Sequence, residues 1–230
     1  MKVKLIQQSA KILTPILHID KFFPELLEHA GRVCTGTEGK LVEGKPNYTF
    51  LETLLKNQHL SVFEHCNISL ELVTDRAISH QLVRHRIAAI SQQSMRYLKF
   101  TTLNGQSHFG MIEPAKWNEW DESTKQFWLD STQRAANDYE TAISLGMAAE
   151  DARRLLPHAT ATKLVVTWNL RQTLHVLYDD YCGRFTNKHA EKQVRNLMAL
   201  LVETAKSESE FLYWLLTRFE NIKNGNGANN

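Results

Sequence analysis

Two short segments with the sequence signals of a β-strand interrupt a chain in which most segments have helical periodicity. Within residues 66–74, Ile68, Leu70 and Leu72 fall on one face of an extended chain and polar residues separate them, as in a half-buried strand. Residues 162–168 are rich in β-branched side chains, which favour strands. Because few segments carry strand patterns and many carry helical ones, the sequence predicts an α/β or α+β fold that is rich in helix.

The helical segments are bounded by residues that commonly begin or end a helix. Apolar residues at helical spacing predict a helix over residues 121–145, with Gly146 as its C-terminal stop. Asp75 is placed to cap a helix over residues 76–86. The other expected elements are a short strand at 2–7, a loop at 36–46, and helices at 19–31 (closing near Gly31), 47–57, 148–156, 169–181, 187–206 and 208–221.

Size and composition predict one domain without disulfides. The 230 residues are enough to bury a sizeable core, and 43% hydrophobic with 23% charged residues is an ordinary globular balance. No linker rich in Pro, Gly or Ser divides the chain, so we expect a single domain over residues 1–223 and a flexible tail over 224–230. Cys34, Cys66 and Cys182 are odd in number and form no C-x-x-C pair, which argues against a disulfide framework and a cysteine-based zinc finger.

Several classes of partner are disfavoured by the same features. The N-terminus lacks the apolar run of a signal peptide, and no stretch approaches the roughly 18 apolar residues of a membrane span. Together with the cysteine usage, this predicts a soluble cytoplasmic protein that binds no membrane. The 27 basic and 25 acidic residues give a net charge of +2, too small an excess for a protein that coats long nucleic acids. A small anionic ligand remains compatible, because a few clustered arginines are enough to bind one.

The most informative cluster of polar residues follows the predicted cap at Asp75. If the helix runs over residues 76–86, helical spacing places Gln81, Arg84 and His85 on one face. Such donors repel one another unless an anion neutralises them, and arginine is suited to bidentate phosphate binding. A solvated basic face with local acidic partners is the alternative, but only Glu71 and Asp75 lie near in sequence. The cluster therefore favours a phosphate ligand.

The spacing of this cluster resembles a known family signature. Arg84, His85 and Arg86 are followed after seven residues by Ser94, which is similar to the R-H-R, seven residues, Ser motif of flavin-dependent thymidylate synthases (the ThyX family). Four other segments resemble family segments in the same order and at similar spacing: 30–34, 59–65, 152–157, and Asn169-Leu170-Arg171 followed by His175.

This resemblance implies a fold, an activity and a set of cofactors. The fold would be helix-rich with a small central, mostly antiparallel sheet. The enzyme would bind FAD, reduce it with NADPH (NADH is left open), and take a one-carbon unit from methylenetetrahydrofolate to convert dUMP into dTMP. It would be a homotetramer whose sites lie between subunits. The sequence has no G-x-G-x-x-G loop, so a Rossmann mode of flavin binding is not expected.

The resemblance also implies roles for individual residues. The flavin contacts would be His59, Ser61, Arg84, His85, Arg86, Ser91, Gln92, Asn169, Arg171 and His175. The dUMP contacts would be Gln81, Arg84, Gln92, Ser94, Arg96, Arg153 and Arg184. Ser94 and Arg184 would be the catalytic pair, with Arg184 as the arginine that polarises the uracil, after an insertion near residues 177–183.

Two departures from the family pattern keep alternatives open. The family often has Asn and Glu where this chain has Ser91 and Gln92, and the replacement of a carboxylate by an amide changes the local charge. A related flavin-dependent transfer to another pyrimidine nucleotide, dCMP or UMP, is therefore one alternative, and a non-catalytic nucleotide- or RNA-binding homologue is another. No metal site is expected, because the histidines form neither H-x-x-x-H nor H-E-x-x-H.

Overall fold

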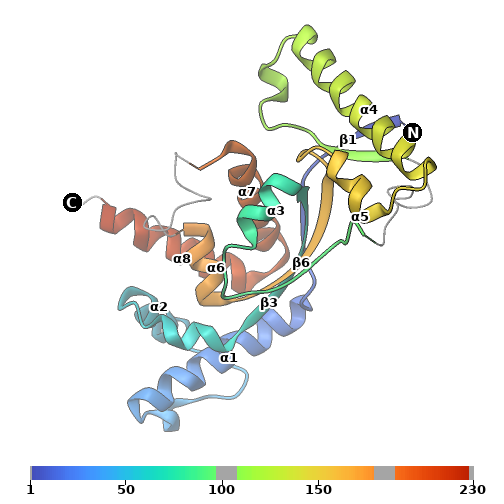
Figure 1. Cartoon of the computed structure of the whole chain (residues 1–230). Coiled ribbons are helices and arrows are strands. Elements are labelled where there is room, and N and C mark those ends of the chain that lie inside the picture. The colour runs from blue at the N-terminus through green and yellow to red at the C-terminus, as the bar shows by residue number, and fades with distance from the viewer. Residues whose placement is uncertain (1, 97–107, 179–189, 228–230) are drawn as a thin grey trace. The chain divides into compact units, whose positions relative to one another are not determined.

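The computed structural model describes residues 2–96, 108–178 and 190–227 (Figure 1). The contacts between backbone positions divide the chain into two compact units. The first unit contains Met1–Ser9, Leu72–His85 and Ile90–Val165. The second unit contains Ala10–Glu71, Arg86–Ala89 and Val166–Asn230. The expectation that residues 1–223 form a single domain stays a prediction.

The first unit contains a two-stranded parallel sheet with one long helix packed on it. Strand β1 (Lys2–Ile6) pairs with β5 (His108–Ile112). Helix α4 (Glu122–Ser144) contacts β1 and lies beside it in Figure 1. The residues buried between these elements and helix α5 (Ala149–Ala152) are Met111, Ala136, Tyr139, Ala142 and Ala152. Asp121 caps α4, since its carboxylate accepts from the backbone N–H of Thr124 at 2.7 Å.

The second unit is built from helices. It contains α1 (Ile16–Thr35), α2 (Tyr48–Lys56), α6 (Leu170–Tyr178), α7 (Lys192–Glu208), α8 (Glu210–Gly227) and the 3₁₀ helices η1 (Glu38–Lys40) and η2 (Leu60–His65). Its core is made of fully buried apolar side chains, among them Ile19, Leu27, Leu51, Phe63, Trp168 and Phe211. The start of α8 is held to α1, because Asp20 accepts from the Ser209 hydroxyl and from the N–H of Phe211.

A four-stranded sheet has strands in both units. Its order is β2 (Ser9–Ile12), β3 (Asn67–Asp75), β6 (Ala161–Asn169), β4 (Ala89–Gln92). This sheet is antiparallel, so the predicted class of a helix-rich fold with a small, mostly antiparallel sheet is confirmed. Along β3 the residues Ile68, Leu70 and Leu72 are buried, as their alternation predicts.

Two predicted helix ends differ from the structure by four residues each. Helix α1 does not close at Gly31 but continues to Thr35, where Gly36 ends it in the left-handed region. Gly31 instead allows close packing, because a Cβ there would lie 2.8 Å from the Leu54 Cδ1 atom of α2. Helix α3 (Arg76–Leu82) is four residues shorter than expected, since the chain leaves the helix to enter β4, which pairs with β6. Arg84, His85 and Arg86 therefore do not lie on a helix.

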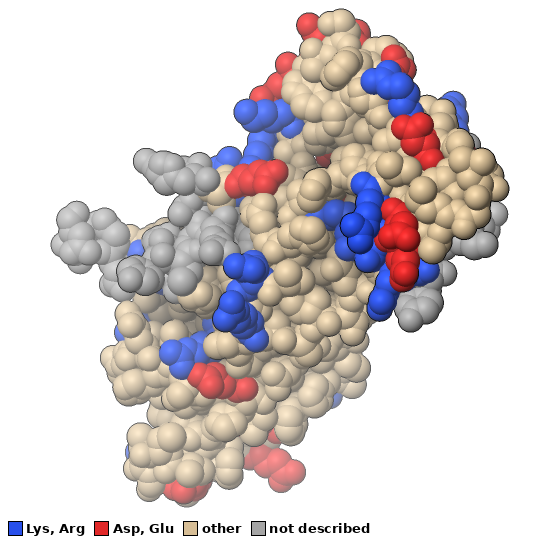
Figure 2. Space-filling view, in the orientation of Figure 1, with Lys and Arg blue, Asp and Glu red and all other residues tan. Residues whose placement is uncertain are grey.

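Strands β2, β4 and β5 and the 3₁₀ helices η2 and η3 (Trp117–Glu119) were not expected from the sequence, and η1 lies within the segment 36–46 that was expected to be a loop. The helix expected over residues 148–156 is found as α5 followed by the 3₁₀ helix η4 (Arg153–Leu155). Helix α8 extends to Gly227 and so includes part of the segment 224–230 that was expected to be a tail. On the face shown in Figure 2, Lys and Arg side chains are interspersed with Asp and Glu. No helix within the described residues is long and apolar enough to cross a membrane.

Candidate functional site

Helix α3 is anchored at its N-terminus by two kinds of hydrogen bond. The Asp75 carboxylate accepts from the N–H of Ile78 at 2.7 Å, which confirms the predicted cap. The backbone N–H of Arg76 donates to the carbonyl of His158 at 2.9 Å. The first turn of α3 is therefore tied to the turn that precedes β6, and the side chain of Arg76 starts from a fixed position.

A cleft of about 190 Å³ opens beside this first turn, within the first unit. Its lining residues are Arg76, His80, Met95, Arg153, Arg154, Leu156, Pro157 and His158. Arg153 is one of the residues that the family resemblance assigns to dUMP. The imidazole rings of His80 and His158 lie edge to face, with 5.8 Å between their centroids. The cleft thus gathers three arginines and two histidines around one hollow.

Two of these arginines have no acidic partner in the part of the chain that the structure describes. Arg76 donates only a long hydrogen bond, 3.4 Å, to the Thr162 hydroxyl, and the Nε–H of Arg153 donates to the Glu150 carbonyl at 3.1 Å. No carboxylate of the described residues lies within ion-pair distance of either guanidinium. Burial, and then the positive charge of Arg153, lower the pKa of Arg76. The cleft can therefore accept an anion, which would relieve this repulsion.

Of the other residues expected to contact the nucleotide, those within the described part of the chain also lie in the first unit. Gln92, in β4, donates from its amide to the hydroxyls of Ser79 at 2.9 Å and Thr162 at 3.2 Å. It therefore links β4 to α3 and β6. The Ser94 hydroxyl accepts from the backbone N–H of Arg96 at 3.2 Å. Gln81 lies in the last turn of α3 and is half-buried, whereas Arg84, Ser91 and Arg96 are exposed.

Most residues expected to contact the flavin lie in the second unit. The segment that contains His59 and Ser61 lies beside the start of α6, because the N–H of Leu170 donates to the Cys66 carbonyl at 2.9 Å. Asn169 caps α6 by accepting from the N–H of Gln172 at 2.7 Å, so its side chain has a structural role.

The charged residues of this group have different surroundings. The Arg171 guanidinium pairs with the Glu64 carboxylate at 2.5 Å. His175 lies one turn further along α6 and is half-buried. Arg86 is exposed in the second unit, whereas Arg84 and His85 belong to the first. Arg184 and most of the insertion near 177–183 lie outside the described residues.

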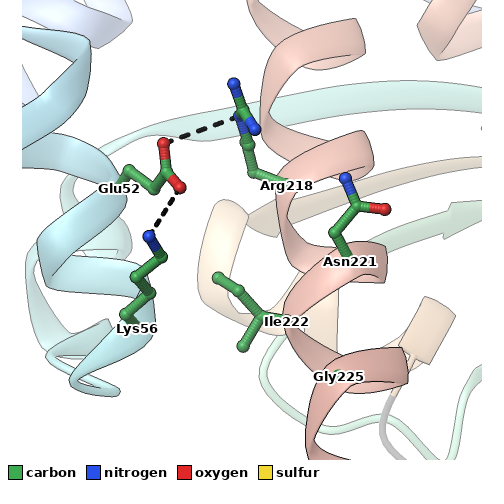
Figure 3. A pocket seen from close by; sticks show the side chains of 6 residues that line it. All are labelled: Glu52, Lys56, Arg218, Asn221, Ile222 and Gly225. Carbon is green, nitrogen blue, oxygen red and sulfur yellow. Dashed lines mark ion pairs between the residues drawn. The ribbon is translucent and has the colours of Figure 1, made fainter.

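A second cleft, of about 350 Å³, lies between α2 and α8 in the second unit (Figure 3). Glu52 points toward both cations there, at 2.9 Å from Lys56 and 3.6 Å from Arg218. The hydrogen bond from Lys56, aided by the charge of Arg218, lowers the pKa of the Glu52 carboxyl. Because the shared carboxylate already serves both cations, we regard this cleft as a structural ion-pair network.

Comparison with known proteins identifies the family. The family model described as "Thymidylate synthase complementing protein" (Thy1) matches residues 19–209. The chain belongs to the flavin-dependent thymidylate synthase family. The predicted resemblance is thereby confirmed. Among curated members, the flavin-dependent thymidylate synthase of Geobacter sulfurreducens is 34% identical over 190 residues, which cover 80% of this chain and 78% of that protein. The one from Thermococcus kodakarensis is 30% identical over 210 residues, covering 90% and 80%.

Other relatives match over a smaller share of their own length. The flavin-dependent thymidylate synthase of Thermococcus onnurineus is 38% identical over 160 residues, 69% of this chain and 62% of that protein. Among solved structures, the UMP/dUMP methylase PolB from Streptomyces cacaoi, bound with 5-Br dUMP, has a TM-score of 0.69 at 18% identity and covers 94% of this chain and 98% of its own. This structural likeness supports the fold alone.

Three residues that line the first-unit cleft or hold an expected flavin contact were not identified from the sequence. Arg76 and His80 line the first-unit cleft, and their spacing of four residues on the predicted helix was the available signal. Glu64 lies inside the family-like segment 59–65, but its pairing with Arg171 joins distant parts of the chain and left no local signal. The described residues contain no group of three His, Cys, Asp or Glu side chains that could hold a metal ion.

Proposed function

We propose that this chain catalyses the reductive methylation of dUMP at C5 to give dTMP, with FAD as cofactor, NADPH as reductant and methylenetetrahydrofolate as one-carbon donor. Membership of the flavin-dependent thymidylate synthase family supports this assignment. The structural observation that supports this assignment is the first-unit cleft. There the Arg153 guanidinium has no carboxylate partner among the described residues. A nucleotide phosphate is the anion that such a fork binds well.

The residues assigned to the flavin suit a cofactor with a diphosphate and a polar ring edge. His59, Ser61 and Arg171 are exposed polar side chains of the second unit, on segments joined by the Leu170–Cys66 hydrogen bond. They supply the donors that FAD needs, so the chemistry of the donor set fits the cofactor. The bound flavin supplies the redox chemistry of the reaction. The remaining flavin contacts we propose are Arg84, His85, Arg86, Ser91, Gln92, Asn169 and His175.

The chain's own residues bind and orient the nucleotide in this proposal. Arg153 and Arg96 bind the 5′-phosphate, and Ser94 adds a hydroxyl donor. Gln81 donates to and accepts from the pyrimidine edge, while Arg84 and Gln92 complete the contacts. Arg184 polarises the uracil by donating to its carbonyl, which stabilises negative charge that develops on the ring. We expect Arg184→Ala to abolish turnover and to leave flavin binding intact; equal turnover in the variant would contradict this role.

The proposed assembly is a cytoplasmic homotetramer with active sites shared between subunits. Light scattering of the purified protein tests its mass. A monomer that turns over dUMP would contradict this part of the proposal.

The decisive experiment follows flavin reduction and product together. The protein is reconstituted with FAD, and NADPH is added without oxygen, with and without dUMP. We expect dUMP to accelerate flavin bleaching, and dTMP to form once methylenetetrahydrofolate is present. A protein that binds no flavin, or that binds flavin but forms no dTMP, would contradict the assignment.

One observation favours a second substrate. PolB, which shares this fold, is a UMP/dUMP methylase whose structures hold 5-Br dUMP or 5-Br UMP. Here the family's common carboxylate is replaced by Gln92, whose amide donates to Ser79 and Thr162. The neutral Gln92 amide changes the charge beside the nucleotide, which is the basis for considering UMP or dCMP as the substrate. Side-by-side assays with dUMP, UMP and dCMP at equal concentration distinguish the substrates, and the largest kcat/KM identifies the preferred one.

A further inference from the structure

The side chain of Gln92 is held in one orientation by two buried hydroxyls of the first unit. Its Nε2 atom donates to the Ser79 hydroxyl at 2.9 Å and to the Thr162 hydroxyl at 3.2 Å. A side-chain amide nitrogen carries two hydrogens, so these two contacts use both of its donors. Oε1 of Gln92 accepts no hydrogen bond from the residues that the structure describes. The acceptor end of the amide is therefore the part left to meet a ligand.

The direction of these hydrogen bonds is set by Ser79, which lies in α3. Its hydroxyl donates to the Arg76 carbonyl at 2.9 Å, and a hydroxyl has a single hydrogen, so Ser79 can only accept from Gln92. If the amide were reversed, Oε1 would face an oxygen that has no hydrogen to offer, at a serine that is fully buried. The glutamate that the family often has at this position would meet the same conflict. Ser79 and Gln92 are therefore a matched pair.

Gln92 is linked to the first-unit cleft through a shared hydroxyl. The Thr162 hydroxyl accepts from Gln92 and also, at 3.4 Å, from Nη1 of Arg76, which lines the cleft. The backbone at this point is fixed as well, because the N–H of Gln93 donates to the Lys163 carbonyl of β6 at 2.9 Å. The orientation of the amide is thus set by the protein itself, beside the place where we expect the nucleotide.

An acceptor in a fixed orientation distinguishes between the two pyrimidine rings. N3 of uracil carries a hydrogen and donates, whereas N3 of cytosine carries a lone pair and accepts. Sugar hydroxyls both donate and accept, so an amide in either orientation would satisfy them. A ring edge is the part of the nucleotide for which the orientation matters. A site whose polar group is left unpaired by an analogue rejects that analogue.

We propose that Ser79 is a positioning residue that directs Oε1 of Gln92 toward the N3–H of the pyrimidine, and that this pair makes the site select a uracil over a cytosine nucleotide. The inference rests on the proposed function, because Gln92 is one of the proposed nucleotide contacts. It deepens that function, since it favours dUMP and UMP over dCMP. In this role Ser79 acts only through Gln92.

The test measures the choice between two nucleotides that differ in their ring edge. Calorimetry gives the Kd values of dUMP and dCMP for the protein reconstituted with FAD. We expect the wild type to bind dCMP at least tenfold more weakly than dUMP. In Ser79→Ala the amide is free to turn over, so we expect this ratio to fall at least fivefold. A merely structural defect would weaken both nucleotides together and leave the ratio unchanged.

The matched control is Ser144→Ala in α4. The Ser144 hydroxyl donates to the Thr141 carbonyl at 2.8 Å, the same local bond that Ser79 makes to Arg76, but Ser144 is exposed. This control should keep the wild-type ratio within twofold. The inference is overturned if Ser79→Ala also keeps it within twofold, or if the wild type binds both nucleotides equally. If Ser79→Ala does not fold, Thr162→Val decides, because it removes the other acceptor of the amide, and we expect the ratio to fall at least threefold.

Two further readouts separate this inference from the proposed activity. A protein that prefers dUMP in a way that depends on Ser79 but forms no dTMP contradicts only the proposed activity. A lower FAD affinity of Ser79→Ala with an unchanged nucleotide ratio means that Oε1 serves the flavin, and it overturns the inference. Without any nucleotide, NMR of the ¹⁵N-labelled Gln92 amide follows hydrogen exchange. We expect exchange at least fivefold faster in Ser79→Ala than in Ser144→Ala, and equal rates overturn the inference.

Discussion

The carboxylate of Glu64 and the guanidinium of Arg171 lie 2.5 Å apart, although 107 residues separate them along the chain. Glu64 belongs to η2, and Arg171 lies in the first turn of α6. Their side chains are about half exposed, at 45% and 52%. A pair exposed to this extent contributes only about 0–1 kcal/mol to stability. Its more important effect is geometric, because it fixes the direction of an arginine that we assign to the flavin.

We therefore expect Glu64→Gln to weaken FAD binding about fivefold while changing the free energy of unfolding by less than about 1 kcal/mol. The physical reason is that the neutral amide no longer orients the Arg171 fork by a charge-assisted hydrogen bond. Flavin titration followed by fluorescence gives the affinity, and urea unfolding gives the stability. Glu52→Gln is the control, since it removes another ion-paired carboxylate from the second unit. Identical FAD affinity in the two variants would show that Glu64 does not position Arg171.

A second prediction concerns the close approach of β1 and β5. A Cβ added at Gly110 would lie 2.4 Å from the Ile6 Cδ1 atom and 3.3 Å from the Ala161 Cβ atom. We expect Gly110→Ala to lower the free energy of unfolding by about 1–3 kcal/mol, which is typical of overpacking. Adding Ile6→Val removes the colliding atom, so the double variant should regain at least half of that loss. Urea unfolding of the two single variants and the double variant measures this coupling, and strictly additive losses would rule out the collision.

The elements that the sequence predicted best are those whose signals are local. The alternation in β3 and the cap Asp75 lie within a few residues of the structure they specify, and both are found as predicted. Strand β4 escaped prediction because its formation depends on pairing with β6, far away in the chain. The same pairing ends α3 at Leu82, which overturns the expected helical face of Arg84 and His85.

The residues of the candidate site show the same difference between local signals and long-range contacts. Family-like segments identified Asn169 and Arg171, but the carboxylate that holds Arg171 could not be found from spacing. In the same way Arg153 was expected to bind phosphate, whereas its neighbour Arg76 comes from another element and is brought near only by the fold. Residue types carry the chemistry of a site, and long-range contacts decide which of them act together.

A third prediction concerns a buried ion pair in the second unit. The Glu28 carboxylate accepts from the Nε–H of Arg32 at 2.6 Å and from the backbone N–H of Asn47 at 2.6 Å. Arg32 also lies over the Phe50 ring, 4.4 Å from its centroid. Both charged side chains are almost fully buried, so Glu28→Gln leaves an uncompensated buried guanidinium. We expect the free energy of unfolding to fall by about 3–5 kcal/mol.

Two companion variants test the cause of that loss. Glu28→Gln combined with Arg32→Met removes the buried charge as well, and we expect the double variant to be more stable than Glu28→Gln alone. Glu122→Gln breaks an exposed pair with Lys125 and should cost less than about 1 kcal/mol. Urea unfolding compares the three. A double variant as unstable as Glu28→Gln would mean that the loss does not come from the unpaired charge.

The last prediction concerns the stability of the protein at high pH. Cys66 is buried, its thiol lies 3.8 Å from the Phe23 carbonyl, and burial raises the thiol pKa from 9.0 to about 12. In the unfolded chain the thiol ionises near its ordinary pKa, so between about pH 9 and pH 12 the unfolded state has lost a proton that the folded state keeps. The contribution of this thiol is therefore complete below pH 9. It falls by at most about 1.4 kcal/mol per pH unit as the pH rises toward 12.

The variant Cys66→Ala isolates this contribution. Burial also raises the pKa of Tyr48 and Tyr178, but these tyrosines are present in both proteins and cancel in the difference. Removing the thiol costs packing energy at every pH, and the Tyr178–Glu220 hydrogen bond is retained. We expect the stability advantage of the wild type over Cys66→Ala, measured by urea unfolding, to shrink by about 2 kcal/mol between pH 8 and pH 10.5, because only the wild type has a buried thiol to keep protonated. A constant difference across that range would mean that Cys66 ionises in the folded protein as readily as in the unfolded chain.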